Sequence, residues 1–139
     1  GYHSINRYPR ADFVSLNTPE VRIATHDRYD SVENLAKKII GQLGAKHLAV
    51  TLGSGGAILL NKSPETIYKT PVLSTKVLDR IGAGDAFLSL SGLCLGGGLD
   101  SDIALFVGSA AAALDVQMVC NREPIIPVNL YKYINTLLK

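Results

Sequence analysis

The chain has 139 residues, 47% hydrophobic and 19% charged, a composition that excludes intrinsic disorder and indicates one folded domain. A net charge of +2 is too small to indicate a nucleic-acid or acidic-membrane partner. Cys94 and Cys120 exclude a disulfide scaffold, and no apolar run reaches the about 20 residues of a membrane-spanning helix. Each cysteine follows an apolar residue, so we expect buried, reduced thiols. With no signal peptide at its start, the chain is expected in the cytoplasm.

Two strands are expected in the first third of the chain. Residues 11–16 are mostly apolar and predict a short buried strand. This strand must end before Pro19, because proline cannot donate a ladder hydrogen bond. Residues 47–52 stay apolar for most of their length and predict a parallel strand covered on both faces.

Residues 30–43 predict a helix between these strands. Asp30 followed by Glu33 predicts a capping box, and Gly44 predicts the C-terminal stop. Apolar residues recur at helical spacing over this segment: Val32, Leu35, Ala36, Ile39, Ile40 and Leu43.

A hairpin and a helix follow. Residues 57–60 and 67–73 flank a polar turn and predict a hairpin, whose second strand is shortened or placed at a sheet edge by Pro71. Residues 83–95 predict a helix that ends at three successive glycines, although its serines and a glycine weaken the pattern.

Two more helices are expected near the C-terminus. Ser101 and Asp102 predict the cap of a helix that runs to about Asp115, in which Gly108 and neighbouring alanines suit close packing. Asn129 predicts the cap of a last helix. Its apolar face comprises Leu130, Tyr133, Ile134, Leu137 and Leu138.

The most informative segment is residues 79–87, Asp-Arg-Ile-Gly-Ala-Gly-Asp-Ala-Phe. Gly82 and Gly84 stand where a loop enters a helix, so backbone N–H groups there can approach a ligand closely. The N-terminus of a helix offers unpaired donors and a partial positive charge, which favour an anion. Asp85 in the first turn either caps this helix or serves a function. Capping alone does not explain the two glycines or Asp79 upstream.

A second glycine-rich segment follows Thr51. It is not a dinucleotide fingerprint, because Ile58 stands where the third glycine would be and a strand follows instead of a helix. A glycine-rich turn at the carboxyl end of a strand is still where ligands bind in open α/β sheets. A plain tight turn is the alternative interpretation.

The remaining patterns are weaker. Asn17 and Glu20 form an Asn-x-x-Glu pattern that by itself indicates little. The three histidines, His3, His26 and His47, lack metal-ligand spacing, so we expect them to be surface or core residues.

In this order, the Asn-x-x-Glu pattern, the glycine-rich strand end and residues 79–87 resemble the C-terminal half of the ribokinase-like (PfkB) carbohydrate kinases. The likeness extends from about residue 11 onward. It implies an α/β fold, the ribokinase-like three-layer αβα architecture, incomplete here, with a mostly parallel sheet and an antiparallel hairpin. It also implies that residues 1–139 are the C-terminal nucleotide-binding and catalytic part of a sugar kinase domain that uses ATP and Mg²⁺.

The resemblance gives the matching residues their expected roles. Asp85 is expected to be the catalytic base for the sugar hydroxyl, and the amides of Gly82, Ala83 and Gly84 an anion hole for the transferring phosphoryl group. Asn17 and Glu20 correspond to the pair near the nucleotide phosphates and Mg²⁺, Glu20 through water. Asp79 aligns with a residue that helps to hold a monovalent cation in some members. The nucleotide cleft is expected to include Thr51, Gly53, Ser54 and Gly56, and the adenine pocket to lie near residues 108–113 and up to Asn121.

Two departures from the family pattern bear on the function. Arg80 stands where many members have threonine, which questions the monovalent-cation site. The N-terminal half that carries the sugar pocket in the family has no counterpart here, so the isolated chain is expected to be inactive. An uncovered sheet edge would favour self-association or pairing with that half.

The expected sugar substrate depends on which kinases of the family the chain resembles in shorter segments. Residues 79–87, 121–123 and 130–134 resemble kinase domains fused to nucleotidyltransferases, as in bifunctional ADP-heptose synthesis enzymes, which favours a heptose-phosphate substrate. Asp79-Arg80 favours the alternative, a 2-keto-3-deoxygluconate-type sugar-acid kinase. A non-catalytic nucleotide-binding or structural fragment is the third alternative.

Overall fold

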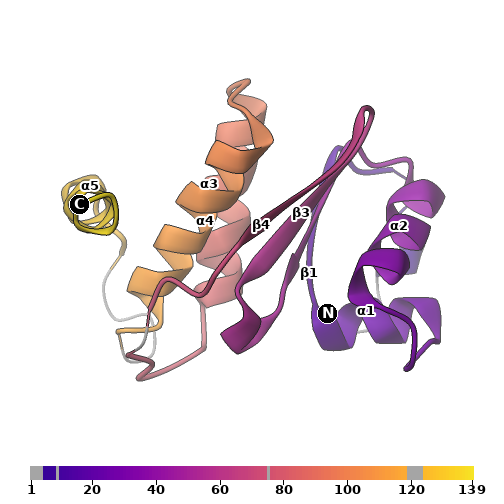
Figure 1. Cartoon of the computed structure of the whole chain (residues 1–139), viewed down its shortest axis with the longest axis horizontal. Helices are drawn as coiled ribbons and strands as arrows, with labels where there is room; N and C mark the ends of the chain where they lie inside the picture. The colour runs from indigo at the N-terminus through magenta and orange to yellow at the C-terminus, as the bar shows by residue number, and fades with distance from the viewer. Residues whose placement is uncertain (1–4, 9, 75, 119–123) are drawn as a thin grey trace. The chain divides into compact units, whose positions relative to one another are not determined.

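The computed structural model describes residues 5–8, 10–74, 76–118 and 124–139. It divides into two compact units, Gly1–Lys69 and Thr70–Lys139, whose helices and strands are drawn in Figure 1. Cys120 and Asn121 lie outside the described residues, as do His3 and residues 122–123.

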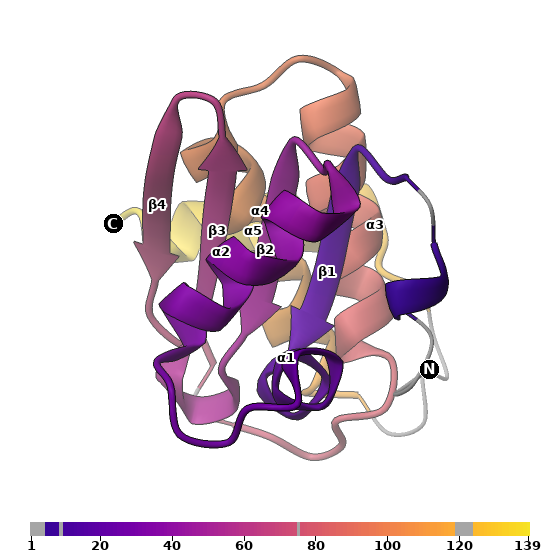
Figure 2. The same cartoon turned by 90° about the vertical axis from the view of Figure 1, so that its right-hand side faces the viewer.

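The first unit is built on a sheet with the strand order β1-β2-β3-β4 (Figure 2). Its strands are β1 (Phe13–Asn17), β2 (His47–Thr51), β3 (Ala57–Lys62) and β4 (Glu65–Thr70). β1 and β2 are parallel, with Asn17 opposite Thr51, and β3 returns antiparallel to β2. The parallel pair and the hairpin are therefore confirmed, and β4 ends at Thr70, directly before Pro71.

Two helices cover one face of this sheet, α1 (Thr18–Thr25) and α2 (Val32–Leu43) (Figure 2). Their apolar residues form one core with alternate residues of the strands, so burial of this surface drives the unit together. The core contains Val14, Leu16, Val21, Ala24, Leu35, Ala36, Ile39, Ile40, Leu43, Leu48, Val50, Ile58 and Leu60. The expected amphipathic face of residues 30–43 is confirmed, and Gly44 ends α2 with a φ of 64°.

One helix of this unit was missed, and one expected cap was wrong. Pro19 does end β1, but it also lies in the first turn of a helix that the sequence reasoning missed, because a helix start tolerates proline. The cap of α2 is Ser31 instead of Asp30, with the Ser31 hydroxyl accepting from the Asn34 amide at 3.1 Å. Asp30 instead pairs with the ammonium group of Lys38 at 3.1 Å.

The second unit contains α3 (Ala83–Gly96), α4 (Ser101–Asp115) and α5 (Pro127–Leu137). α3 and α4 pack closely at Gly108, where an added Cβ would lie 1.9 Å from the Ser91 hydroxyl oxygen. That hydroxyl is buried and donates to the Ala104 carbonyl at 3.1 Å. Ser91, one of the residues that weakened the helical pattern, therefore serves the helix crossing.

The starts of α4 and α5 differ from expectation. Asp100 is the N-cap of α4, one residue before Ser101, and in the part of the chain that the structure describes no side chain caps either helix. α5 begins at Pro127, ahead of Asn129, because proline fits the first helical position. Leu138 lies beyond the helix and is 71% exposed, so it does not belong to the apolar face.

The remaining expectations about burial are met in part. Cys94 is half-buried instead of fully buried, and that burial raises the pKa of its thiol. No described helix combines the length and the apolar character that crossing a membrane requires.

Candidate functional site

The carboxyl end of β1 is shaped by a reciprocal pair of hydrogen bonds. The Asn17 side-chain oxygen accepts from the Glu20 amide at 2.9 Å, and the Glu20 carboxylate accepts from the Asn17 amide at 2.8 Å. This is a capping box, which starts α1 directly after the strand. Among the described residues, the second carboxylate oxygen of Glu20 has no hydrogen-bond partner, so this oxygen is available to a ligand or water.

Thr51 lies beside this cap. It is opposite Asn17 in the parallel pair, and its carbonyl accepts from the Thr18 hydroxyl at 3.3 Å. The carboxyl ends of β1 and β2 and the N-terminus of α1 therefore meet at one edge of the sheet. This edge is the usual place for ligands in open α/β folds.

The glycine-rich segment forms a tight turn at the same edge, between β2 and β3. The Leu52 amide donates to the Gly56 carbonyl at 2.8 Å, and the Gly56 amide donates to the Gly53 carbonyl at 3.2 Å. Gly53 and Gly56 have φ values of 60° and 87°, which disfavour any residue with a Cβ. Ser54 is exposed at the tip of this turn. The structure thus brings Asn17, Glu20 and Thr51 together with the turn.

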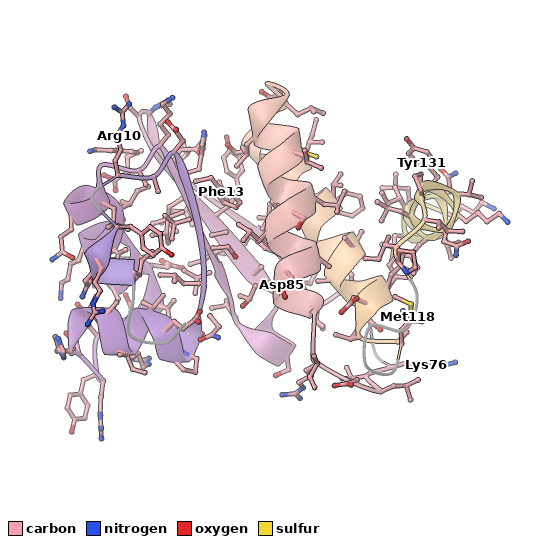
Figure 3. The ribbon with its side chains drawn as sticks, turned by 180° about the vertical axis from the view of Figure 1, so that it is seen from behind. Arg10, Phe13, Lys76, Asp85, Met118 and Tyr131 are labelled. Carbon is pink, nitrogen blue, oxygen red and sulfur yellow. The ribbon has the colours of Figure 1, made fainter. Side chains whose placement is uncertain are left out.

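The second group of predicted residues lies at the start of α3. Gly82 is the N-cap, with a φ of 96°, and its carbonyl accepts from the Ala86 amide at 2.9 Å. No side chain among the described residues caps this helix, so the carboxylate of Asp85 is not used as a cap. Asp85 is exposed in the first turn (Figure 3). The structure therefore presents uncapped amides and a carboxylate at one helix end, as an anion-binding reaction site requires.

Asp79 shapes the turn before this helix. Its carboxylate accepts from the Ile81 amide at 3.0 Å. The amides of Leu78 and Asp79 both donate to the Val116 carbonyl, at 2.7 and 3.2 Å. The loop is therefore fastened to the residue that follows α4.

Asp115 is a candidate that the sequence reasoning missed. It is only 4% exposed, and burial is the main cause that raises the pKa of its carboxyl, followed by the negative charges of Asp79 and Asp85. The sequence carried one signal, an acidic residue closing an alanine-rich helix, which we read only as a helix boundary.

The structure also tests whether these residues fit a cation. Within the described part of the chain, no three His, Cys, Asp or Glu side chains are grouped to hold a metal ion. Mg²⁺ in phosphoryl-transfer sites usually takes one or two carboxylates and completes its shell with water and substrate phosphates. The single available oxygen of Glu20 fits that limited role.

A cavity of about 520 Å³ lies at the opposite end of α1. Its lining includes His26, Lys38 and Gln42, and none of the predicted site residues. It is therefore separate from the group at the carboxyl ends of β1 and β2.

Comparison with known proteins now decides the family. A model described as pfkB family carbohydrate kinase matches residues 3–126. The chain belongs to this family. It is 30% identical over 135 residues to the bifunctional protein HldE of Koribacter versatilis, covering 95% of this chain and 26% of that protein. It is 32% identical over 107 residues to a 2-dehydro-3-deoxygalactonokinase of Haloferax volcanii, covering 77% of this chain and 33% of that protein.

A solved structure supports the same fold. A ribokinase from Thermotoga maritima matches with a TM-score of 0.78 and 27% identity, covering 89% of this chain and 42% of that one. The ribokinase-like αβα fold expected from the sequence is confirmed, as is the family. This pfkB-family chain spans about a quarter to a third of the two curated relatives' length.

Proposed function

We propose that the chain supplies the ATP-binding and catalytic residues of a carbohydrate kinase, which transfers the terminal phosphoryl group of ATP to a sugar hydroxyl. The observation that carries the proposal is the glycine-bounded, uncapped start of α3 with Asp85 exposed in its first turn. Oriented backbone donors stabilise charge that develops in a transition state without reorganising during the reaction. Family membership supplies the class of reaction.

In this proposal each residue has a defined step. Asp85 takes the proton of the sugar hydroxyl, whose oxygen then forms a bond to the γ-phosphorus while the bond to ADP breaks. The amides of Gly82, Ala83 and Gly84 receive the charge on the transferring group. Such positioning and charge stabilisation are the main requirements of phosphoryl transfer, and a positioned base contributes about 10²–10⁴-fold.

The nucleotide phosphates are assigned to the other group of residues. Glu20 would hold Mg²⁺ through water with its available oxygen, and Asn17 would lie beside the phosphates. Mg²⁺, when bound, neutralises phosphate charge. Thr51, Gly53, Ser54 and Gly56 would form part of the nucleotide cleft. A monovalent cation at Asp79 remains a prediction.

A heptose phosphate is the favoured substrate, since the relatives include HldE proteins from several organisms. A sugar-acid kinase is the second candidate, supported by the likeness to the 2-dehydro-3-deoxygalactonokinase. Turnover assays of a complete kinase domain that contains this chain, with both sugar classes, separate the two. A third candidate is a nucleotide-binding or structural module without turnover, which would bind ATP but phosphorylate neither sugar.

We also propose a partner and a location. β1 is the end strand of the described sheet, so its outer edge would pair with further N-terminal residues of a kinase domain or with a second copy. A mass that stays monomeric at all concentrations would argue against the second copy. The proposed location is the cytoplasm, which cell fractionation would test.

The decisive experiment is titration of the 139-residue chain with Mg-ATP. Wild type should bind saturably and Gly84→Val should not, because the new side chain would block the approach of phosphate to the first turn of α3. The matched control is Gly96→Val at the other end of the same helix. A Cβ at either glycine meets no atom within 4 Å, so both variants should fold. Equal binding by the two variants would refute the assignment.

A further inference from the structure

The loop that leads into α3 is held at two places in the second unit. It runs from Pro71 to Gly82 without a helix or strand in its described residues. The Val116 carbonyl holds its later part through two amides. The phenol of Tyr133 holds its earlier part, donating to the Leu73 carbonyl at 2.6 Å.

Tyr133 also belongs to the apolar face of α5. That face packs in one cluster with Leu73 of the loop and with Ala86 and Leu90 of α3. Ala86 directly follows Asp85, so the cluster that α5 joins includes both the beginning of the loop and the first turn of α3. The family model ends at residue 126 and α5 begins at Pro127, so this helix lies outside the matched segment.

The polar environment of Tyr133 joins three elements. Burial raises the pKa of its phenol, while hydrogen bonds with the side chains of Ser74 and Gln117 oppose that rise. Gln117 in turn donates to the Ala113 carbonyl of α4 at 2.7 Å. Tyr133 thus connects the loop with the end of α4. This connection lies close in sequence to Val116, whose carbonyl holds the later part of the loop.

We propose that Tyr133 is a positioning residue, which holds the loop by the Leu73 carbonyl and thereby fixes the uncapped amides of Gly82 to Gly84. The functional consequence of this inference rests on the proposed function, in which the amides of Gly82 to Gly84 receive the charge of the terminal phosphoryl group of ATP. It predicts that loss of the phenol hydroxyl loosens the loop and weakens recognition of that phosphate, while the fold remains intact.

The test compares Tyr133→Phe with Tyr131→Phe in the 139-residue chain. Tyr131 lies on the same helix and is 66% exposed, so it is a matched control (Figure 3). Amide hydrogen exchange is measured by NMR at Leu78 and Asp79 and, as an internal reference, in the middle of α4. Exchange of the two loop amides should rise about fivefold in Tyr133→Phe, the effect of one lost hydrogen bond. Tyr131→Phe and the α4 reference should not change.

The affinities for ATP and ADP, both with Mg²⁺, supply the functional readout. Tyr133→Phe should lower the ratio of ATP affinity to ADP affinity by up to about fivefold, since the coupling cannot exceed the lost tether. Unchanged loop exchange would overturn the proposal, as would a uniform rise across the unit or faster loop exchange with an unchanged affinity ratio. If wild type binds neither nucleotide but loop exchange responds as expected, the tether stands and the proposed kinase function fails.

Discussion

The substitution Glu20→Gln separates the structural role of this residue from its proposed role with Mg²⁺. A glutamine oxygen can accept from the Asn17 amide as the carboxylate does at 2.8 Å, so the capping box survives. Only the attraction between the charge and the helix N-terminus is lost, about 0.5 kcal/mol. Glu20→Ala removes the acceptor as well and should cost about 1–2 kcal/mol.

The binding effects should not follow the order of these stabilities, as they would if Glu20 had a purely structural role. Removing the carboxylate should weaken the Mg²⁺-dependent gain in ATP affinity about tenfold, a loss typical of residues that orient metal-bound ligands. Glu20→Gln and Glu20→Ala should show this loss equally. Urea unfolding gives the stabilities, and calorimetric titration with ATP in the presence and absence of Mg²⁺ gives the affinities. An unchanged Mg²⁺ effect in Glu20→Gln would refute the metal role and leave Glu20 as a helix cap alone.

Three further predictions follow from the second unit. Gly108→Ala should destabilise the chain by about 2 kcal/mol despite alanine's higher helix propensity, because the new Cβ would lie 1.9 Å from the Ser91 hydroxyl; a more stable variant in urea unfolding would contradict the close helix crossing. Asp85→Asn in a complete kinase domain should abolish sugar phosphorylation and preserve ATP binding, and unchanged turnover would contradict the base assignment. Because the pKa of Asp115 is raised above its ordinary 3.8 on folding, stability should fall as pH rises through the window above that value. Asp115→Asn should remove this fall, and identical pH dependence of the urea midpoint in both proteins would count against it.

The sequence predicted most elements that a single physical signal defines. The α2 face follows from apolar residues at helical spacing, and the hairpin follows from two apolar segments around a polar turn. The start of α3 was located by its glycines, because positive φ at Gly82 is a requirement that few residues meet. These signals depend only on residues that are close together along the chain, so a single sequence is enough to recognise them.

Features went unpredicted where one residue has two functions, or where burial determines the role of a residue. Pro19 was read only as a strand terminator, although it also opens α1. The ligand roles expected of Asn17 and Glu20 stay predictions, and what their pattern did not reveal is that the two residues cap that helix. Asp115 was marked in the sequence only as an acidic residue that closes an alanine-rich helix, because its significance depends on its being 4% exposed beside other acidic residues. Such facts depend on tertiary packing, which spacing along the chain does not encode.

The start of α3 makes local order and ligand affinity interdependent. Many helices complete their first turn with a capping side chain, whereas α3 begins at a glycine, and its leading amides, like those of α4 and α5, have no capping side chain among the described residues. An anion bound there would act as the missing cap. Anything that binds only the ordered form stabilises it in proportion to the logarithm of its concentration. The first turn of α3 should therefore fray in the free chain and tighten as phosphate-bearing ligand accumulates, so that thermal stability reports occupancy directly.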